Sequence, residues 1–145
     1  MSIHDEANLI LKLYELRREE TMRKARDWYF REFNPQSVAD FQNAMFSEHS
    51  GHLRMVTSYW DMAAALVNHG AIGQGLFAEM NGEYIGVFAK VQPFLNEIRG
   101  MMSPQYLVNL EKLVNSVPGD QERMAMFRDR MKMIQAEMAK RQAGA

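Results

Sequence analysis

Apolar residues recur every three or four positions along almost the whole chain, with polar residues between them. This spacing matches one turn of an α-helix. A half-buried β-strand alternates apolar and polar residues instead, and no segment does so over several residues. The pattern predicts an all-α protein that forms a single helical bundle of about six helices, with long first and last helices. One domain is expected over residues 1–145, with residues 141–145 as a frayed tail.

Capping residues, glycines and prolines predict where these helices begin and end. A first helix is expected over residues 5–33, ending at Asn34-Pro35 because the residue before a proline disfavours the α conformation. At 1.5 Å per residue this helix would be ~43 Å long, so we expect it to overhang a compact domain. Ser37 is expected to cap a short helix. The later helices are expected at 48–69 before Gly70, at 71–81, at 82–99 with a kink at Pro93, from Ser103-Pro104 to Pro118-Gly119, and at 120–142.

The helix expected over residues 48–69 carries two apolar stripes. An apolar surface of this width is typical of a helix that is covered on two sides. We therefore expect this helix to lie at the centre of the fold. The stripes consist of Leu53, Val56, Trp60, Ala63 and Val67, and of Met55, Tyr59, Met62 and Leu66.

The last predicted helix carries a short apolar seam with the three-and-four spacing of a coiled coil. Methionine, which occurs 13 times in the chain, suits adaptable contact surfaces. The seam is expected either to dock on the parent bundle or to pair with another chain. Methionines two positions apart resemble copper ligands, but on a helix they point in different directions, so no cofactor is expected. This candidate interaction site consists of Met124, Phe127, Met131, Ile134 and Met138.

Composition narrows the classes of partner and chemistry. The formal net charge of -1 provides no basic field, so neither nucleic acid nor a membrane surface is expected as a partner. The chain has no cysteine, which excludes disulfides, thiolate catalysis and thiolate metal sites. Its apolar runs are far shorter than the ~20 residues that span a bilayer, and its first residues do not resemble a signal peptide. These observations predict a soluble cytoplasmic protein.

Two histidines near the start of the helix over residues 48–69 are candidate metal ligands. His49 and His52 lie three positions apart beside Glu48, and Ser47 is the expected helix cap. A zinc or iron site needs three or four ligands, and this segment supplies at most three. His69 lies about 25 Å further along the same helix, because each residue adds ~1.5 Å. We therefore interpret the pair as an exposed helix entrance and keep a metal site as the alternative.

The segment that begins at residue 59 resembles a known pattern. It reads Tyr59-Trp60-Asp61-x-x-Ala64-x-x-Val67-x-x-Gly70-x-Ile72 and is similar to the centre of an uncharacterised bacterial family of all-helical domains of unknown function. The resemblance covers roughly residues 10–100. It implies an all-helical fold with a long charged first helix, and no assigned activity. It also implies a membrane helix ahead of this domain in many members, and none is expected here.

No local arrangement of nucleophile, base and orienting acid predicts an enzyme, so no catalytic residue is assigned. Asp61 and Glu79 are the only acids whose neighbours look buried, and such acids are usually satisfied by a helix end or an arginine. The sequence favours a non-enzymatic interaction module that forms a homodimer or binds another helical protein. Two alternatives stay open: a small-ligand-binding or metal-binding protein, or an enzyme, that uses the His49/His52 region, and an apolar pocket lined by Trp60, Phe88 and methionines.

Overall fold

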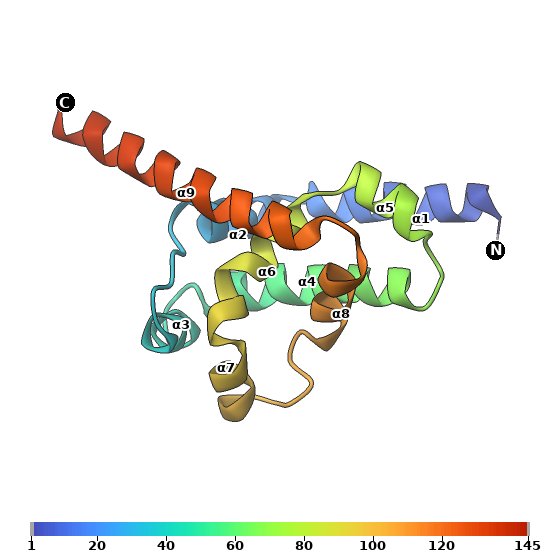
Figure 1. The fold of residues 1–145 in the computed structure, drawn as a ribbon, viewed down its shortest axis with the longest axis horizontal. Coiled ribbons are helices and arrows are strands. Elements are labelled where there is room, and N and C mark those ends of the chain that lie inside the picture. Colours follow the sequence, from blue (N-terminus) through green and yellow to red (C-terminus); the bar gives the residue numbers. More distant parts are fainter. Residues whose placement is uncertain (1, 145) are drawn as a thin grey trace.

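The computed structural model describes residues 2–144, within which it has nine α-helices, one 3₁₀ helix and no strand (Figure 1). The all-α prediction is confirmed. The prediction of about six helices is too low, since the described residues contain nine, and the helices expected over residues 5–33 and 82–99 are each divided. The elements are α1 (Ile3–Arg17), α2 (Glu20–Arg31), α3 (Val38–Met45), α4 (Ser50–Asn68), α5 (Gln74–Met80), α6 (Glu83–Val91), the 3₁₀ helix η1 (Gln92–Phe94), α7 (Leu95–Met101), α8 (Val108–Ser116) and α9 (Asp120–Ala143).

The continuous first helix predicted over residues 5–33 is wrong, because the chain leaves the α conformation between α1 and α2. Glu19 has φ -59° and ψ 145°, and its carboxylate accepts a 3.1 Å hydrogen bond from the backbone N–H of Met22. The side chain therefore caps α2, and a negative charge is favourable at that end of a helix. Helix α1 has only 15 residues and is ~23 Å long, so the overhanging first helix of ~43 Å that the sequence predicted is not formed.

Helix α4 lies at the centre of the fold, as predicted, and contacts α2, α3, α5, α6 and α8. All five residues of the first predicted stripe are buried. The second stripe is divided, since Tyr59 is buried and Met62 is exposed. The helix ends before Gly70, whose φ of 84° lies in the left-handed region that glycine adopts most readily.

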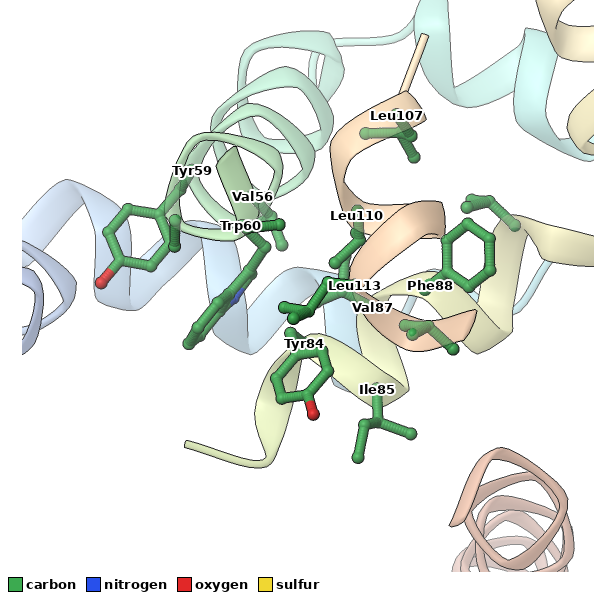
Figure 2. Close-up of a cluster of buried hydrophobic side chains, with 14 of the residues drawn as sticks. Val56, Tyr59, Trp60, Tyr84, Ile85, Val87, Phe88, Leu107, Leu110 and Leu113 are labelled. Carbon is green, nitrogen blue, oxygen red and sulfur yellow. The ribbon is translucent and has the colours of Figure 1, made fainter. Parts of the chain in front are cut away.

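The main core forms where α4, α6 and α8 meet (Figure 2). Trp60 of α4 is fully buried, and its ring centroid lies 6.4 Å from those of Phe77 and Tyr84. Leu110 and Leu113 of α8 are also fully buried. Pro93 lies in η1, so the predicted kink is present as a short 3₁₀ segment between α6 and α7.

The helix start predicted at Ser103-Pro104 is wrong, because residues 104–107 form turns and α8 begins at Val108. Leu107 precedes α8 with φ 55° and ψ 29°, a conformation that costs about 1 kcal/mol or more for a residue other than glycine. Its side chain is buried in the core, which offsets that cost. Burial of the Leu107 side chain therefore outweighs the helix start that the Ser103-Pro104 pattern favours.

Within residues 2–144, every helix is too short or too polar to cross a lipid bilayer. This agrees with the short apolar runs of the sequence.

Candidate interaction surface

The first turns of α9 are anchored to α6 by polar contacts. Asp120 is fully buried and accepts a 2.7 Å hydrogen bond from the hydroxyl group of Tyr84. It also forms a 2.7 Å ion pair with Arg123, one turn further along α9. A buried carboxylate needs such partners, because an unpaired one would carry a large desolvation cost. These contacts fix where α9 begins and the direction in which it leaves the body.

Two residues of the predicted seam pack within the chain. Met124 is only 2% exposed. The ring of Phe127 lies against Gly86 of α6 and makes an edge contact with Phe30 of α2, with the ring centroids 6.3 Å apart. A Cβ atom built on Gly86 would stand 2.6 Å from Cε2 of Phe127, so only glycine permits this approach. The seam therefore docks on the parent bundle in its first half.

The second half of the seam has no such cover. Met131 is partly buried, and every described residue from Lys132 to Gly144 is exposed, including Ile134 at 40% and Met138 at 44%. In Figure 1 the last turns of α9 extend beyond the rest of the molecule. The helix continues to Ala143, so the predicted tail is helical as far as that residue, and Ala145 lies outside the described residues.

A groove of about 530 Å³ lies where α9 leaves the body. One wall is α9, and the others come from the end of α6, η1 and the segment between α2 and α3. Its lining includes three cationic side chains, Lys90, Arg128 and Lys132, and no carboxylate. The full lining is Asn34, Pro35, Gln36, Ala89, Lys90, Pro93, Phe94, Phe127, Arg128, Met131, Lys132 and Gln135.

Lys90 closes the C-terminal end of α2. Its ammonium group donates hydrogen bonds to the carbonyl oxygens of Tyr29 and Phe33, at 2.8 and 2.7 Å, and to Oδ1 of Asn34, at 3.1 Å. Cations are favourable at this end of a helix. Burial lowers the pKa of Lys90 from 10.5 to about 8. These hydrogen bonds therefore hold the segment after α2 in place.

The two histidines of the candidate metal site pack against α2, whereas Glu48 is exposed. The expected cap at Ser47 is wrong, because α4 begins at Ser50 and both Glu48 and His49 lie in the preceding turn. The His49 ring stacks on Trp28 with centroids 5.1 Å apart, and the His52 ring lies 6.2 Å from the same indole. Nδ1 of His52 is buried without a hydrogen-bond partner. Among residues 2–144, no group of three or more histidine and acidic side chains is placed to hold a metal ion.

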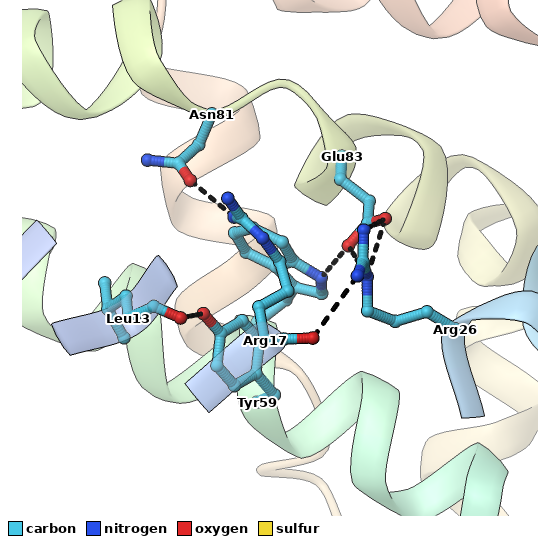
Figure 3. A network of polar contacts seen from close by, with 7 residues as sticks. Leu13, Arg17, Arg26, Tyr59, Asn81 and Glu83 are labelled. Atoms are coloured by element: carbon cyan, nitrogen blue, oxygen red, sulfur yellow. Dashed lines mark hydrogen bonds and ion pairs between the residues drawn. The ribbon is translucent and has the colours of Figure 1, made fainter. Parts of the chain in front are cut away.

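A polar network joins the α1–α2 junction to α4 and α6 (Figure 3). The guanidinium of Arg26 binds both carboxylate oxygens of Glu83 at 2.9–3.0 Å, and one of these oxygens also accepts from the indole N–H of Trp60. Arg17 donates to Oδ1 of Asn81 at 2.7 Å. Tyr59 donates to the backbone carbonyl of Leu13. Each of these groups is therefore paired, and the network joins α1, α2, α4 and α6 to one another.

Two further hollows, of about 280 and 330 Å³, lie beside the start of α9 and beside the start of α8. Trp60 and Phe88 line none of the three hollows, because both rings are packed in the core. Sequence reasoning missed the groove and the role of Gly86. A glycine within a helical apolar pattern was the one available signal, since it often marks a close approach of another element.

The family model described as "Domain of unknown function (DUF4760)" matches residues 2–117. No curated protein and no solved structure matches the chain. The matched residues contain α1 to α8. The whole of α9 lies after the match.

Proposed function

The chain belongs to the DUF4760 family, and from that premise we propose that it is a non-enzymatic helical interaction module that self-associates through the exposed half of α9. The predicted resemblance to an uncharacterised helical domain family is confirmed. The description of that family assigns no activity, so the proposal depends on the chain's own geometry.

The observation that supports self-association is the division of the seam. Met124 is buried and Phe127 contacts α6 and α2, whereas Ile134 and Met138 continue the same stripe on a projecting helix. A helical segment of about 13 exposed residues gains little from tertiary packing and is marginal in water, so a partner would stabilise it. Exposed apolar residues at regular spacing on such a segment are typical of a helix that pairs with another helix.

The strength expected of this contact is low. Only a few apolar layers are available on each helix, so the buried area falls in the class of small, transient interfaces. Methionine side chains tolerate imperfect packing, which suits a contact that forms and dissociates readily. A homodimer that depends on concentration in the micromolar range is the expected behaviour.

Sedimentation equilibrium across micromolar concentrations tests the proposal. Ile134→Asp should abolish the dimer and leave the helical content unchanged, because this side chain is exposed and lies outside the core cluster. Ile3→Asp is the matched control, since Ile3 is 59% exposed on α1. A wild-type chain that stays monomeric, or equal behaviour of the two variants, would contradict the proposal.

A further inference from the structure

The groove beside α9 gathers positive charge without a counter-charge. Lys90, Arg128 and Lys132 all line it, and its lining contains no carboxylate. None of the ion pairs formed within residues 2–144 involves any of these three cations. The groove is therefore a local concentration of positive charge on a chain whose formal net charge is -1.

Holding these cations together is unfavourable while the groove is empty. Arg128 and Lys132 are one turn apart on α9, so they lie on the same face of the helix, and like charges at this spacing destabilise it. Lys90 and Arg128 are also partly removed from water, and burial lowers the pKa of both groups. A bound anion would offset the repulsion and replace the lost hydration.

The cations differ in the hydrogen bonds that they can offer to an anion. Lys90 uses its three donors at the end of α2, so it contributes only its charge. One terminal nitrogen of Arg128, Nη2, donates to the carbonyl oxygen of Ala89 at 3.0 Å and to Oε1 of Gln92 at 2.9 Å. These bonds fix the guanidinium at the groove wall, and its remaining N–H groups are the donors for a ligand. Lys132 is exposed one turn further along, where its ammonium group reaches the same anion.

The rest of the lining suits a hydrocarbon chain. Phe94, Phe127 and Met131 line the groove, and each side chain is only partly buried by its own protein. The volume of about 530 Å³ is in the range of sites that hold small organic ligands. An inorganic anion would leave this apolar surface in contact with water, whereas an apolar chain would cover it. The groove therefore matches a ligand with an anionic head and an apolar tail.

We infer that the groove binds a linear carboxylate of the fatty-acid class. The carboxylate lies between Arg128 and Lys132, and the hydrocarbon chain covers Phe94, Phe127 and Met131. The inference goes beyond the proposed self-association and does not depend on it, because neither Ile134 nor Met138 lines the groove.

Isothermal titration calorimetry with sodium dodecanoate, below its micellar concentration, tests the site. One dodecanoate is expected to bind per chain. Acetate has the same head group without the tail, and dodecyltrimethylammonium has the same tail with the opposite charge. Each should bind at least about tenfold more weakly, because it lacks one half of the interaction. Equal binding of dodecyltrimethylammonium would reveal apolar adsorption without a carboxylate site, and equal binding of acetate would reveal a site for small anions. Either result overturns the inference, as does a failure of dodecanoate to bind.

Variants of α9 locate the carboxylate. Lys132→Gln removes an exposed cation without disturbing the core, and it should weaken dodecanoate binding about fivefold. Lys132→Arg keeps the charge and should bind like the wild type. Lys140→Gln is the matched control, because Lys140 is an exposed cation of the same helix outside the groove, and it should leave the affinity unchanged. Equal affinities of Lys132→Gln and Lys140→Gln would overturn the assignment.

Sedimentation of the same variants separates this site from self-association. Lys132→Gln should leave the dimer unchanged, and Ile134→Asp should leave dodecanoate binding unchanged, because Ile134 lies outside the groove. If Lys132→Gln abolished the dimer and dodecanoate did not bind, the groove would be a contact with a second copy, and the inference would be wrong. A monomeric wild type that binds dodecanoate would contradict only the proposed self-association.

Discussion

Phe127 on α9 lies so close to Gly86 on α6 that a Cβ atom at position 86 would stand 2.6 Å from its Cε2 atom. Glycine inside a helix costs about 1 kcal/mol relative to alanine. Here the missing side chain allows an aromatic ring to cover the backbone of α6. This contact, together with the Tyr84–Asp120 hydrogen bond, connects the last helix to the family domain.

Gly86→Ala is expected to loosen the docking of α9. The new methyl group must displace the ring of Phe127, and overpacking of this kind typically costs ~1–3 kcal/mol, which exceeds the gain in helix propensity. Urea denaturation should show a net loss of about 1 kcal/mol. Gly100→Ala is the control, because a Cβ atom there meets nothing within 4 Å. It should stabilise the chain by ~0.5–1 kcal/mol, and equal effects of the two substitutions would contradict this account.

Glu83→Gln is expected to destabilise the junction between α1, α2 and α6. The carboxylate binds Arg26 and Trp60, so an amide in its place leaves a partly buried guanidinium without its counter-charge. The expected loss is ~1–3 kcal/mol. Glu20→Gln removes one partner of the exposed Lys24–Glu20 pair and should cost less than ~0.5 kcal/mol. Chemical denaturation of both variants measures the difference, and similar values would show that the network adds no stability.

The sequence predicted the elements with strong periodicity and clear caps. Helix α4 and its first apolar stripe are present, as are the cap at Ser37 and the end at Gly70. The break at Glu19 was missed because no glycine or proline marks it, and glutamate is not a usual cap. The start of α8 was missed because burial of Leu107 outweighs the local preference of Ser103-Pro104. Local signals cannot report a competing tertiary contact.

The sequence predicted the apolar stripe of the candidate site. It could not predict that one half of the stripe is buried and the other half exposed. Met124 and Ile134 belong to the same regularly spaced stripe, yet Met124 is buried and Ile134 is exposed. Which turns of a regular seam are covered depends on where α6 ends in space, and the periodicity carries no information on that. The groove beside the seam depends on Lys90, whose contacts lie 56 to 61 positions away along the chain.

Stability should depend on pH through Lys90. Burial lowers its pKa from 10.5 to about 8 in the folded chain. Between these values the unfolded chain binds more protons than the folded chain, so the free energy of unfolding rises with pH. The contribution is at its lowest below pH 8, where both states are protonated. Lys90→Met should remove this rise, whose slope is at most ~1.4 kcal/mol per pH unit.

The comparison between wild type and Lys90→Met should be made from pH 8 to pH 10. Burial raises the pKa of Tyr59 and Tyr106 from 10.0 to about 12. Above pH 10 the unfolded tyrosines therefore lose protons first, and stability falls as pH rises. Denaturant titrations at each pH measure the difference between the two proteins. A difference that is constant over this range would show that the pKa of Lys90 is not lowered.

Asp61 is expected to stabilise the fold as a cap for α8. Glu79, the other acid that the sequence analysis named, is not expected to have such a role. The carboxylate of Asp61 accepts a 2.9 Å hydrogen bond from the backbone N–H of Leu110 and a 3.2 Å bond from the side chain of Asn109. Glu79 is exposed on α5.

Asp61→Ala should therefore cost about 1 kcal/mol, since it leaves a first-turn N–H of α8 without its acceptor. Asp61→Asn keeps one acceptor oxygen and should lie between the wild type and Asp61→Ala. Glu79→Ala should change stability by less than ~0.5 kcal/mol. If the alanine variants of the two acids have equal unfolding free energies, Asp61 does not hold the start of α8, and its bonds to that helix contribute nothing to the fold.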